Sequence, residues 1–275
     1  MRPEGDDEMT TIVVLGGTGT IGTQVVRLLR ARGADVRVAS RSTGVDLVTG
    51  QGLAEALDGA QVVIDAAKPG SLDPARIDEF FARAGENVTR HEREAGVGHH
   101  LMLSIVGSDR APDVPFYTAK VRLEQAVRAG EVPWTILHAT QFFEFAPGIA
   151  RASTGPDGGP AHLAPLLVQP VAGADVAAEL VRLAGGTPTT ADLDLAGPEE
   201  FELDDFVRTA LARLGLPGDV VRDPAATYFG GVVDHRALLP GPDASVAPTA
   251  LQDWPSSTER PGSTERPSST AHPGS

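Results

Sequence analysis

The chain has 275 residues, of which 41% are hydrophobic, enough to bury one large core or a core with a smaller lobe. Its formal net charge of −14 disfavours a nucleic-acid partner, because nucleic-acid binding relies on a basic surface that neutralises phosphates. The absence of cysteine excludes disulfides, thiolate nucleophiles and cysteine-ligated metals, and fits a reducing compartment. No apolar stretch is long enough to span a membrane and the acidic start, MRPEGDDEM, is unlike a signal peptide, so we expect a cytoplasmic protein without a membrane partner.

A glycine-rich sequence, GGTGTIG at 16–22, separates two apolar segments near the start of the chain. The run at 12–15 has the composition of a strand buried on both faces, and the apolar residues after 22 recur at helical spacing. Glycine lets the backbone between them turn tightly and approach a pyrophosphate, which the amides at the helix start then face. This order predicts a dinucleotide-binding turn rather than a glycine-rich turn without a ligand. The residues expected to contact the dinucleotide here are Gly16, Thr18, Gly19, Thr20, Ile21 and Gly22.

Strand-like and helix-like segments alternate along the rest of the chain, a pattern typical of an α/β protein whose parallel sheet is covered by helices. We predict strands at 11–15, 35–39, 61–65, 99–104, 133–138 and 191–195, and helices at 20–32, 51–58, 73–95, 117–129, 174–185 and 203–214. The segment from Arg151 to Pro165 is rich in Gly, Pro and Ala, so we expect a mobile, lid-like loop there rather than a core element.

The two ends of the chain differ in composition from the part between them. STERPG at 257, STERPS at 263 and STAHPG at 269 are three copies of a six-residue unit with almost no apolar side chains. Such a segment cannot bury enough surface to offset its ordering entropy, so we predict a disordered, low-complexity tail at 256–275. We also expect a flexible N-terminus at 1–9.

The end of the second predicted strand indicates which dinucleotide is bound. Proteins that prefer NAD usually place an acidic side chain there, where it accepts a hydrogen bond from the ribose 2′-hydroxyl. This chain has Ser40, Arg41 and Ser42 instead, so a guanidinium and two hydroxyls stand where a 2′-phosphate would bind. The residues therefore favour NADP(H) over NAD(H), with a solvated loop arginine as the alternative for Arg41.

Several short sequences together carry a family resemblance. They are GGTGTIG at 16, LSIVG at 103, AK at 119, LHATQFFEF at 137, LVQPVAGADVA at 167 and LAGPE at 195. Over residues 10 to 254 the chain resembles the NmrA-like, atypical short-chain dehydrogenase/reductase family, and is most similar to its bacterial quinone-reductase-like members. The resemblance implies a doubly wound, parallel-sheet Rossmann core at 10–150 and a small C-terminal substrate-binding region at 151–255. It also implies that NADP(H) binds across the strand ends.

The resemblance extends to residues that would surround the dinucleotide. Asp46 and Leu47 resemble the pair that flanks the adenine in this family. Ala66 and Ala67 follow the third strand, where small side chains would let the cofactor lie against the backbone. Lys68 would contact a phosphate or the substrate, with an exposed loop lysine as the alternative.

The expected catalytic residues depart from the short-chain dehydrogenase pattern, in which a tyrosine stands four residues before a lysine on one helix face. Lys120, which we expect to position the nicotinamide ribose, has Phe116 at that place, and phenylalanine donates no proton. Tyr117 lies three residues before the lysine and projects from a different sector of the helix, but it is a candidate, as an alternative to Ser104, to orient the acceptor. Ser104, at the end of the fourth strand, is a candidate to hydrogen-bond a substrate carbonyl or is a buried serine bonded to backbone.

The phenylalanine limits the chemistry. Ordinary ketone reduction needs a positioned proton donor for the alkoxide, whereas the oxyanion formed from a quinone or an enone is stabilised by conjugation and water can protonate it. We therefore predict an NADP(H)-dependent oxidoreductase acting on a quinone-like or enone small molecule. Two alternatives stay open: a non-redox NADP(H)-binding regulator or sensor, and a redox-silent isomerase or cyclase.

Residues that follow the fifth strand are candidates for the substrate pocket, because ligands of open α/β sheets bind at the carboxyl edge. They are His138, Gln141 and Phe142, with core packing as the alternative for the phenylalanine. His91, His99 and His100 have no carboxylate or cysteine partners at metal-ligand spacing, so no metal is expected.

Overall fold

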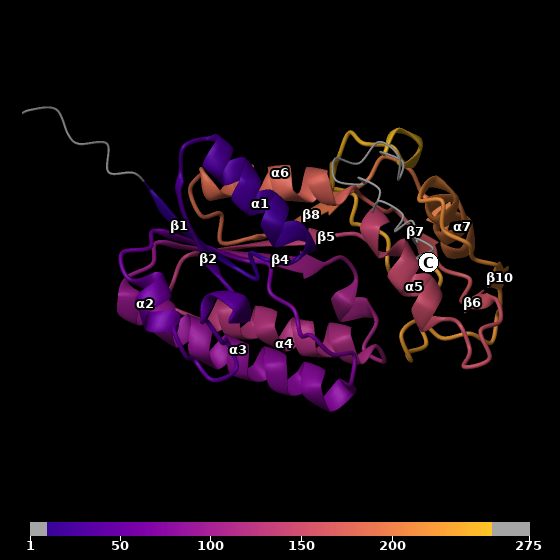
Figure 1. Cartoon of the computed structure of the whole chain (residues 1–275), viewed down its shortest axis with the longest axis horizontal. Helices are drawn as coiled ribbons and strands as arrows, with labels where there is room; N and C mark the ends of the chain where they lie inside the picture. The colour runs from indigo at the N-terminus through magenta and orange to yellow at the C-terminus, as the bar shows by residue number, and fades with distance from the viewer. Residues whose placement is uncertain (1–9, 255–275) are drawn as a thin grey trace, which may run out of the picture.

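A computed structural model of the chain describes residues 10–254, in which seven parallel strands form one sheet in the order β11-β8-β5-β4-β3-β1-β2 (Figure 1). The order reverses between β1 and β3, and open α/β sheets bind ligands at the carboxyl ends of their strands at such a point. The expected α/β Rossmann fold is confirmed, while the segments 1–9 and 256–275 lie outside the described residues. The strands are β1 (Thr11–Leu15), β2 (Asp35–Ala39), β3 (Val62–Asp65), β4 (His99–Ile105), β5 (Trp134–Ala139), β8 (Asp192–Ala196) and β11 (Ser245–Val246).

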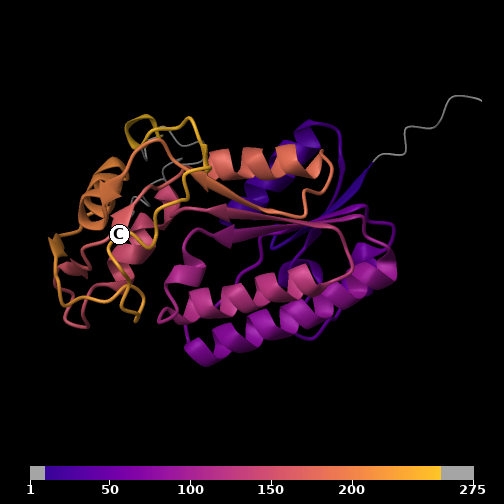
Figure 2. The ribbon, with the colours of Figure 1, turned by 180° about the vertical axis from the view of Figure 1, so that it is seen from behind.

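Helices cover both faces of the sheet (Figures 1 and 2). α1 (Thr20–Ala31) packs beside α6 (Gly173–Ala184) on one face, and α3 (Pro74–Ala95) packs beside α4 (Pro115–Ala129) on the other, with the short α2 (Leu53–Leu57) against α3. Alternate strand residues point to opposite faces, so Val14 packs with α1 and α6, while Val13 joins the core under α2 and α3. This double burial explains why the central strands β1 and β3 are nearly continuous apolar runs.

The start and end of α3 show why sequence signals located the helices well. Its N-cap is Asp73, whose carboxylate accepts the amide of Arg76 at 3.1 Å, and Pro74 occupies the first turn. The helix ends at Gly96, which has a φ of 70°, a left-handed conformation that glycine adopts readily.

The C-terminal part of the described chain builds a small lobe, toward which the arrowheads of β4, β5 and β8 point (Figure 2). Its core includes Phe143, Leu163 and Phe206. Short strands pair in twos, β6 with β10 in parallel and β7 with β9 in antiparallel orientation. Its elements are α5 (Ala146–Ala152), β6 (Ala161–Leu163), β7 (Leu167–Val168), β9 (Phe201–Glu202), α7 (Leu203–Arg213) and β10 (Val220–Arg222); the 3₁₀ helices of the chain are η1 (Arg41–Thr43), η2 (Ser108–Arg110), η3 (Phe143–Phe145) and η4 (Leu251–Asp253).

The predicted loop from Arg151 to Pro165 is wrong at both of its ends. Arg151 belongs to α5, and β6 is a strand in which the buried Ala161 and Leu163 flank the exposed His162. β6 pairs with β10, whose residues come almost sixty positions later, and Leu163 is 1% exposed. A three-residue strand stabilised by so distant a partner has no local signal that outweighs the surrounding glycines and prolines.

Candidate functional site

The glycine-rich turn between β1 and α1 has no room for side chains at two positions. Gly16 has a φ of 71°, and a Cβ there would lie 2.8 Å from the carbonyl oxygen of Ala66. A Cβ on Gly22 would lie 2.2 Å from the carbonyl oxygen of Gly16. In the described chain no side chain caps α1, whose N-cap is Gly19, so the amides of its first turn are left for an anion. This cradle fits the pyrophosphate of a dinucleotide.

Arg41, which follows β2, lines a cavity together with residues of the loop after β3 and of α3. The cavity has a volume of about 300 Å³, and Arg41, Gly70, Arg76 and Phe80 are among its lining residues. A Cβ on Gly70 would lie 3.0 Å from Nη2 of Arg41, so the glycine lets the guanidinium lie against the backbone. Ser40 is occupied locally, since its hydroxyl lies 2.9 Å from that of Ser42.

The other residues expected around the dinucleotide differ in their surroundings. The carboxylate of Asp46 accepts the amides of Val48 at 2.8 Å and Thr49 at 3.3 Å, so it holds a turn. Leu47 is buried in the core, and Lys68 is exposed on the loop after β3. Ala66 and Ala67 are half-buried beside the glycine-rich turn, as a close approach of ligand to backbone requires.

Lys120 is a buried lysine on α4, with 4% of its surface exposed. Its ammonium nitrogen lies 5.1 Å from the ring centre of Phe81, and it makes no hydrogen bond to another residue in the range 10–254. Burial lowers the pKa of Lys120, while the charges of Asp65 and Glu124 oppose that shift. Asp65 ends β3 immediately before Ala66, so the ammonium stands near the edge of the sheet that holds the glycine-rich turn.

Phe116 lies one helical turn before Lys120, and its ring packs edge-on against Phe81 with 5.2 Å between ring centres. Tyr117 points elsewhere, into the core of the C-terminal lobe, where its hydroxyl lies 3.4 Å from that of Tyr228. The structure therefore does not bring Tyr117, a candidate to orient the acceptor, together with Lys120, because the two side chains project from different sectors of α4.

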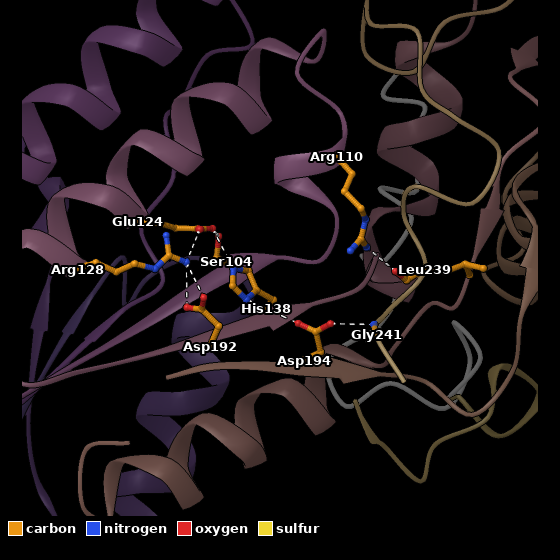
Figure 3. Close-up of polar contacts among 9 residues, drawn as sticks. All are labelled: Ser104, Arg110, Glu124, Arg128, His138, Asp192, Asp194, Leu239 and Gly241. Carbon is orange, nitrogen blue, oxygen red and sulfur yellow. Dashed lines mark hydrogen bonds and ion pairs between the residues drawn. The ribbon is translucent and has the colours of Figure 1, made fainter. Parts of the chain in front are cut away.

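A row of polar side chains crosses three strands beneath α4 (Figure 3). Ser104 on β4 stands in register with His138 on β5, which stands in register with Asp194 on β8. Glu124 of α4 closes the row: it accepts hydrogen bonds from the Ser104 hydroxyl and from Nε2 of His138, the latter at 3.1 Å. The hydroxyl proton of Ser104 is thus used in a hydrogen bond to the carboxylate of Glu124 and does not point toward a substrate.

Glu124 was missed at the level of the sequence. Its second oxygen lies 3.0 Å from Arg128, which also contacts both oxygens of Asp192 at 2.9 Å. Burial opposes ionisation of Glu124, but the hydrogen bonds from His138 and Ser104 and the charge of Arg128 outweigh it and lower the pKa of the carboxyl group. The sequence did contain a signal for Glu124, because it follows Lys120 by four residues and so lies on the same face of the helix.

The three predicted pocket residues lie in different surroundings. His138 faces α4 through its contact with Glu124, and Phe142 belongs to the core under α1 and α6. Gln141 is buried, with 6% of its surface exposed, and neither atom of its amide has a hydrogen-bond partner in the described part of the chain. Of the three, only Gln141 presents polar atoms that the protein leaves unpaired.

Two further observations concern the described residues as a whole. Among residues 10–254, no group of three or more His, Asp or Glu side chains is arranged to hold a metal ion. None of the helices that the structure describes is long and apolar enough to cross a membrane.

The strand order, the glycine-rich turn and the lobe beyond the carboxyl ends of the strands define a Rossmann-type protein of the short-chain dehydrogenase/reductase class. Residues 8–150 match the NmrA-like family, and the chain belongs to this family of NAD(P)-binding, oxidoreductase-like proteins.

Several named relatives match about half of this chain or less. Photosystem II assembly factor Ycf39 of Cyanophora paradoxa is 26% identical over 148 residues, which cover 49% of this chain and 46% of that protein. The epimerase family protein SDR39U1 of Mus musculus is 44% identical over 66 residues, 24% of this chain and 22% of that protein. The chain spans about half the length of the Ycf39 proteins that it matches.

Solved structures with the same fold cover nearly the whole chain. MoeE5 in complex with UDP-glucuronic acid and NAD has a TM-score of 0.69 and 17% identity, over 91% of this chain and 97% of that one. The UDP-glucose 4-epimerase of Thermus thermophilus, in complex with NAD, has a TM-score of 0.65 and 18% identity, over 92% and 94%. At such identities the likeness concerns the fold.

Proposed function

We propose that this chain is an NADP(H)-dependent oxidoreductase that passes a hydride to a quinone-like or enone small molecule. The observation that carries the proposal is a pair of side chains on one face of α4. Lys120 keeps a buried ammonium group without a hydrogen-bond partner in the described chain, and Phe116 stands beside it without a proton to give. An ammonium group so placed can bind the ribose hydroxyls of a dinucleotide.

Because Phe116 donates no proton, a quinone or an enone is a more suitable hydride acceptor than a ketone. The dinucleotide would supply a hydride from its nicotinamide ring when bound. Hydride addition to a ketone leaves an alkoxide that needs a positioned acid, whereas addition to a quinone or enone leaves a conjugated oxyanion that water can protonate. Ser104 supports the same conclusion, because its hydroxyl proton is directed to Glu124.

The preference for NADP(H) rests on the cavity beyond β2. Arg41 and Arg76 line it with one carboxylate, that of Glu79, so its charged lining is positive overall, and the segment 40–42 contains no acidic side chain. Guanidinium groups suit a 2′-phosphate, because they form charge-assisted hydrogen bonds in a fixed fork. The side chain of Arg41 is exposed, so its hydrogen-bond donors are available to a ligand.

The test is to mix the protein with NADPH and a panel of quinones, enones and simple ketones. Oxidation of NADPH is measured as the loss of its absorbance. We expect oxidation of NADPH with at least one quinone and none with simple ketones. Oxidation with simple ketones, or with none of the acceptors, would contradict the proposed reaction.

Phe116 also favours a second candidate, a regulator that binds NADP(H) without redox chemistry. Tight NADPH binding without turnover on any acceptor would support this role in place of the reductase. Product formed from a substrate without a change in NADPH absorbance would instead indicate an isomerase or cyclase.

A further inference from the structure

The chain contains two tyrosines, and both belong to one buried contact. Tyr117 comes from α4 and Tyr228 from the loop after β10, yet their hydroxyl oxygens are 3.4 Å apart and their ring centres 6.2 Å apart. Each is 5% exposed. Two segments 111 residues apart in sequence therefore bring both phenols of the protein to the same place.

Gln141 is the third polar side chain of this cluster. Its amide lies close enough to both phenols to lower the pKa of each, but neither its nitrogen nor its oxygen has a partner in hydrogen-bonding geometry within residues 10–254. A buried amide without partners is costly, because it has given up its hydrogen bonds to water. An unpaired donor and acceptor beside two hydroxyls is the arrangement expected where a ligand supplies the missing partner.

A strained turn holds Tyr228 in place. Tyr228 and Gly231 exchange backbone hydrogen bonds at 2.9 and 3.1 Å across Phe229 and Gly230, which have φ values of 48° and 86°. Phe229 is thus a non-glycine residue with left-handed backbone, a conformation that persists where surrounding structure enforces it and that clusters at ligand sites. A Cβ on Gly231 would lie 2.6 Å from the carbonyl carbon of Asp113, so the turn packs directly on the segment before α4.

We propose that Tyr117, Gln141 and Tyr228 form a neutral recognition site for a carbonyl or hydroxyl oxygen of the substrate. The proposal rests on the proposed function for the identity of that substrate, a quinone or an enone. The amide nitrogen and one phenol would donate to the oxygen, and the second phenol would accept from the first or from a substrate hydroxyl. In this role Tyr117 takes part in substrate binding from a position where it cannot replace the missing tyrosine beside Lys120.

The surroundings of the cluster favour an apolar, uncharged ligand. Burial raises the pKa of both phenols, so both keep their protons across the physiological range. Besides burial, only the other phenol and Gln141 influence these two pKa values. Neither is a cation that could balance the negative charge of a carboxylate or phosphate ligand. The same core contains Val114, Phe143 and Leu238, which would pack against the ring of the substrate.

The experiment uses the full chain with carbon-labelled tyrosine rings, whose two NMR signals both report on this site. Menadione is the probe, and the chain has no cysteine to which a quinone would add. We expect menadione to shift both signals. Gln141→Leu and Tyr228→Phe should each raise the Kd of menadione about five- to tenfold, the usual effect of losing one neutral hydrogen bond. Thr118→Ser is the matched control, since its hydroxyl can still reach the carbonyl of Pro112, and it should leave the Kd unchanged.

The variants keep the rings or the bulk of the side chains. The tyrosine signals that each variant retains, both in Gln141→Leu and that of Tyr117 in Tyr228→Phe, also report whether it is folded. Suppose that the protein reduces quinones with NADPH, but menadione does not shift the tyrosine signals or Gln141→Leu leaves the KM for the quinone unchanged. Either result would contradict the proposed recognition site and leave the proposed function intact. Shifted signals in a protein that binds no NADPH would support the site and overturn the proposed function.

Discussion

Phe116 lies one helical turn before Lys120 on the same face of α4, and both side chains contact the ring of Phe81, at 5.2 Å and 5.1 Å from its centre. A phenol at 116 would therefore stand beside the lysine in the short-chain dehydrogenase arrangement. We expect Phe116→Tyr to add simple-ketone reduction, with a rate gain of about a hundredfold or more, the usual contribution of a positioned general acid. The measurement is NADPH oxidation with cyclohexanone.

The control for that variant is Phe201→Tyr. Phe201 packs against Phe206 in the C-terminal lobe, with 6.3 Å between ring centres, and does not line the cavity that Arg41 faces. It should give no ketone reduction. Equal activity in both variants would show that the position beside Lys120 has no special role.

Replacing Lys120 should lower activity without lowering stability. Lys120→Met removes a buried charge that has no hydrogen-bond partner in the described chain and keeps a side chain of similar length. We expect the free energy of unfolding to stay level or to rise by about 1 kcal/mol, because the desolvation cost disappears. NADPH turnover should fall at least about tenfold, from loss of one charge-assisted hydrogen bond. Turnover at the wild-type level would remove Lys120 from the mechanism.

Glu124 should stabilise the protein through its contacts with Ser104, His138 and Arg128. Glu124→Gln keeps an acceptor for Ser104 but loses the charge that pairs with Arg128. We expect a loss of about 2 kcal/mol in urea unfolding, less than the roughly 3–5 kcal/mol for breaking a fully buried pair, because Arg128 is 31% exposed and keeps Asp192 as a partner. Glu131→Gln is the control, since Glu131 forms an exposed pair with Arg93, and it should cost less than about 0.5 kcal/mol.

His99 makes stability depend on acid pH. Burial, reinforced by the charge of His100, lowers the pKa of His99 from 6.5 to about 4, while Nε2 stays 3.0 Å from Thr135. Between these pH values the unfolded chain binds a proton that the folded chain does not, so the contribution of His99 to stability is lost as pH falls through this window. His99→Gln should flatten the loss measured by unfolding at pH 7 and pH 5, and an unchanged slope would assign the acid sensitivity to other groups.

The sequence predicted the main sheet and its helices closely, because their signals are local. β1 and β3 are nearly continuous apolar runs, and α3 has a capping aspartate, a proline and a terminal glycine. β6 and β10 were missed because three residues carry no period, and their pairing depends on each other.

The site was predicted in part for a similar reason. Chain-local spacing located the glycine-rich turn and identified Phe116 as the residue in place of tyrosine. Glu124 was missed because a carboxylate on a helix is usually solvated, and only tertiary packing places it against Ser104 and His138. The partnership of Tyr117 with Tyr228 joins segments 111 residues apart, which no local pattern indicates.

The central claim is that the glycine-rich turn holds a dinucleotide and that Arg41 selects its 2′-phosphate. Calorimetric titration of the protein with NADPH and NADH, repeated on Arg41→Ala and on the surface control Arg83→Ala, tests it most directly. We predict that wild type and the control bind NADPH more tightly than NADH. Arg41→Ala should weaken NADPH alone by about ten- to a hundredfold, the effect of losing hydrogen bonds to a charged group. No heat with either dinucleotide, or equal losses for both in Arg41→Ala, would contradict the claim.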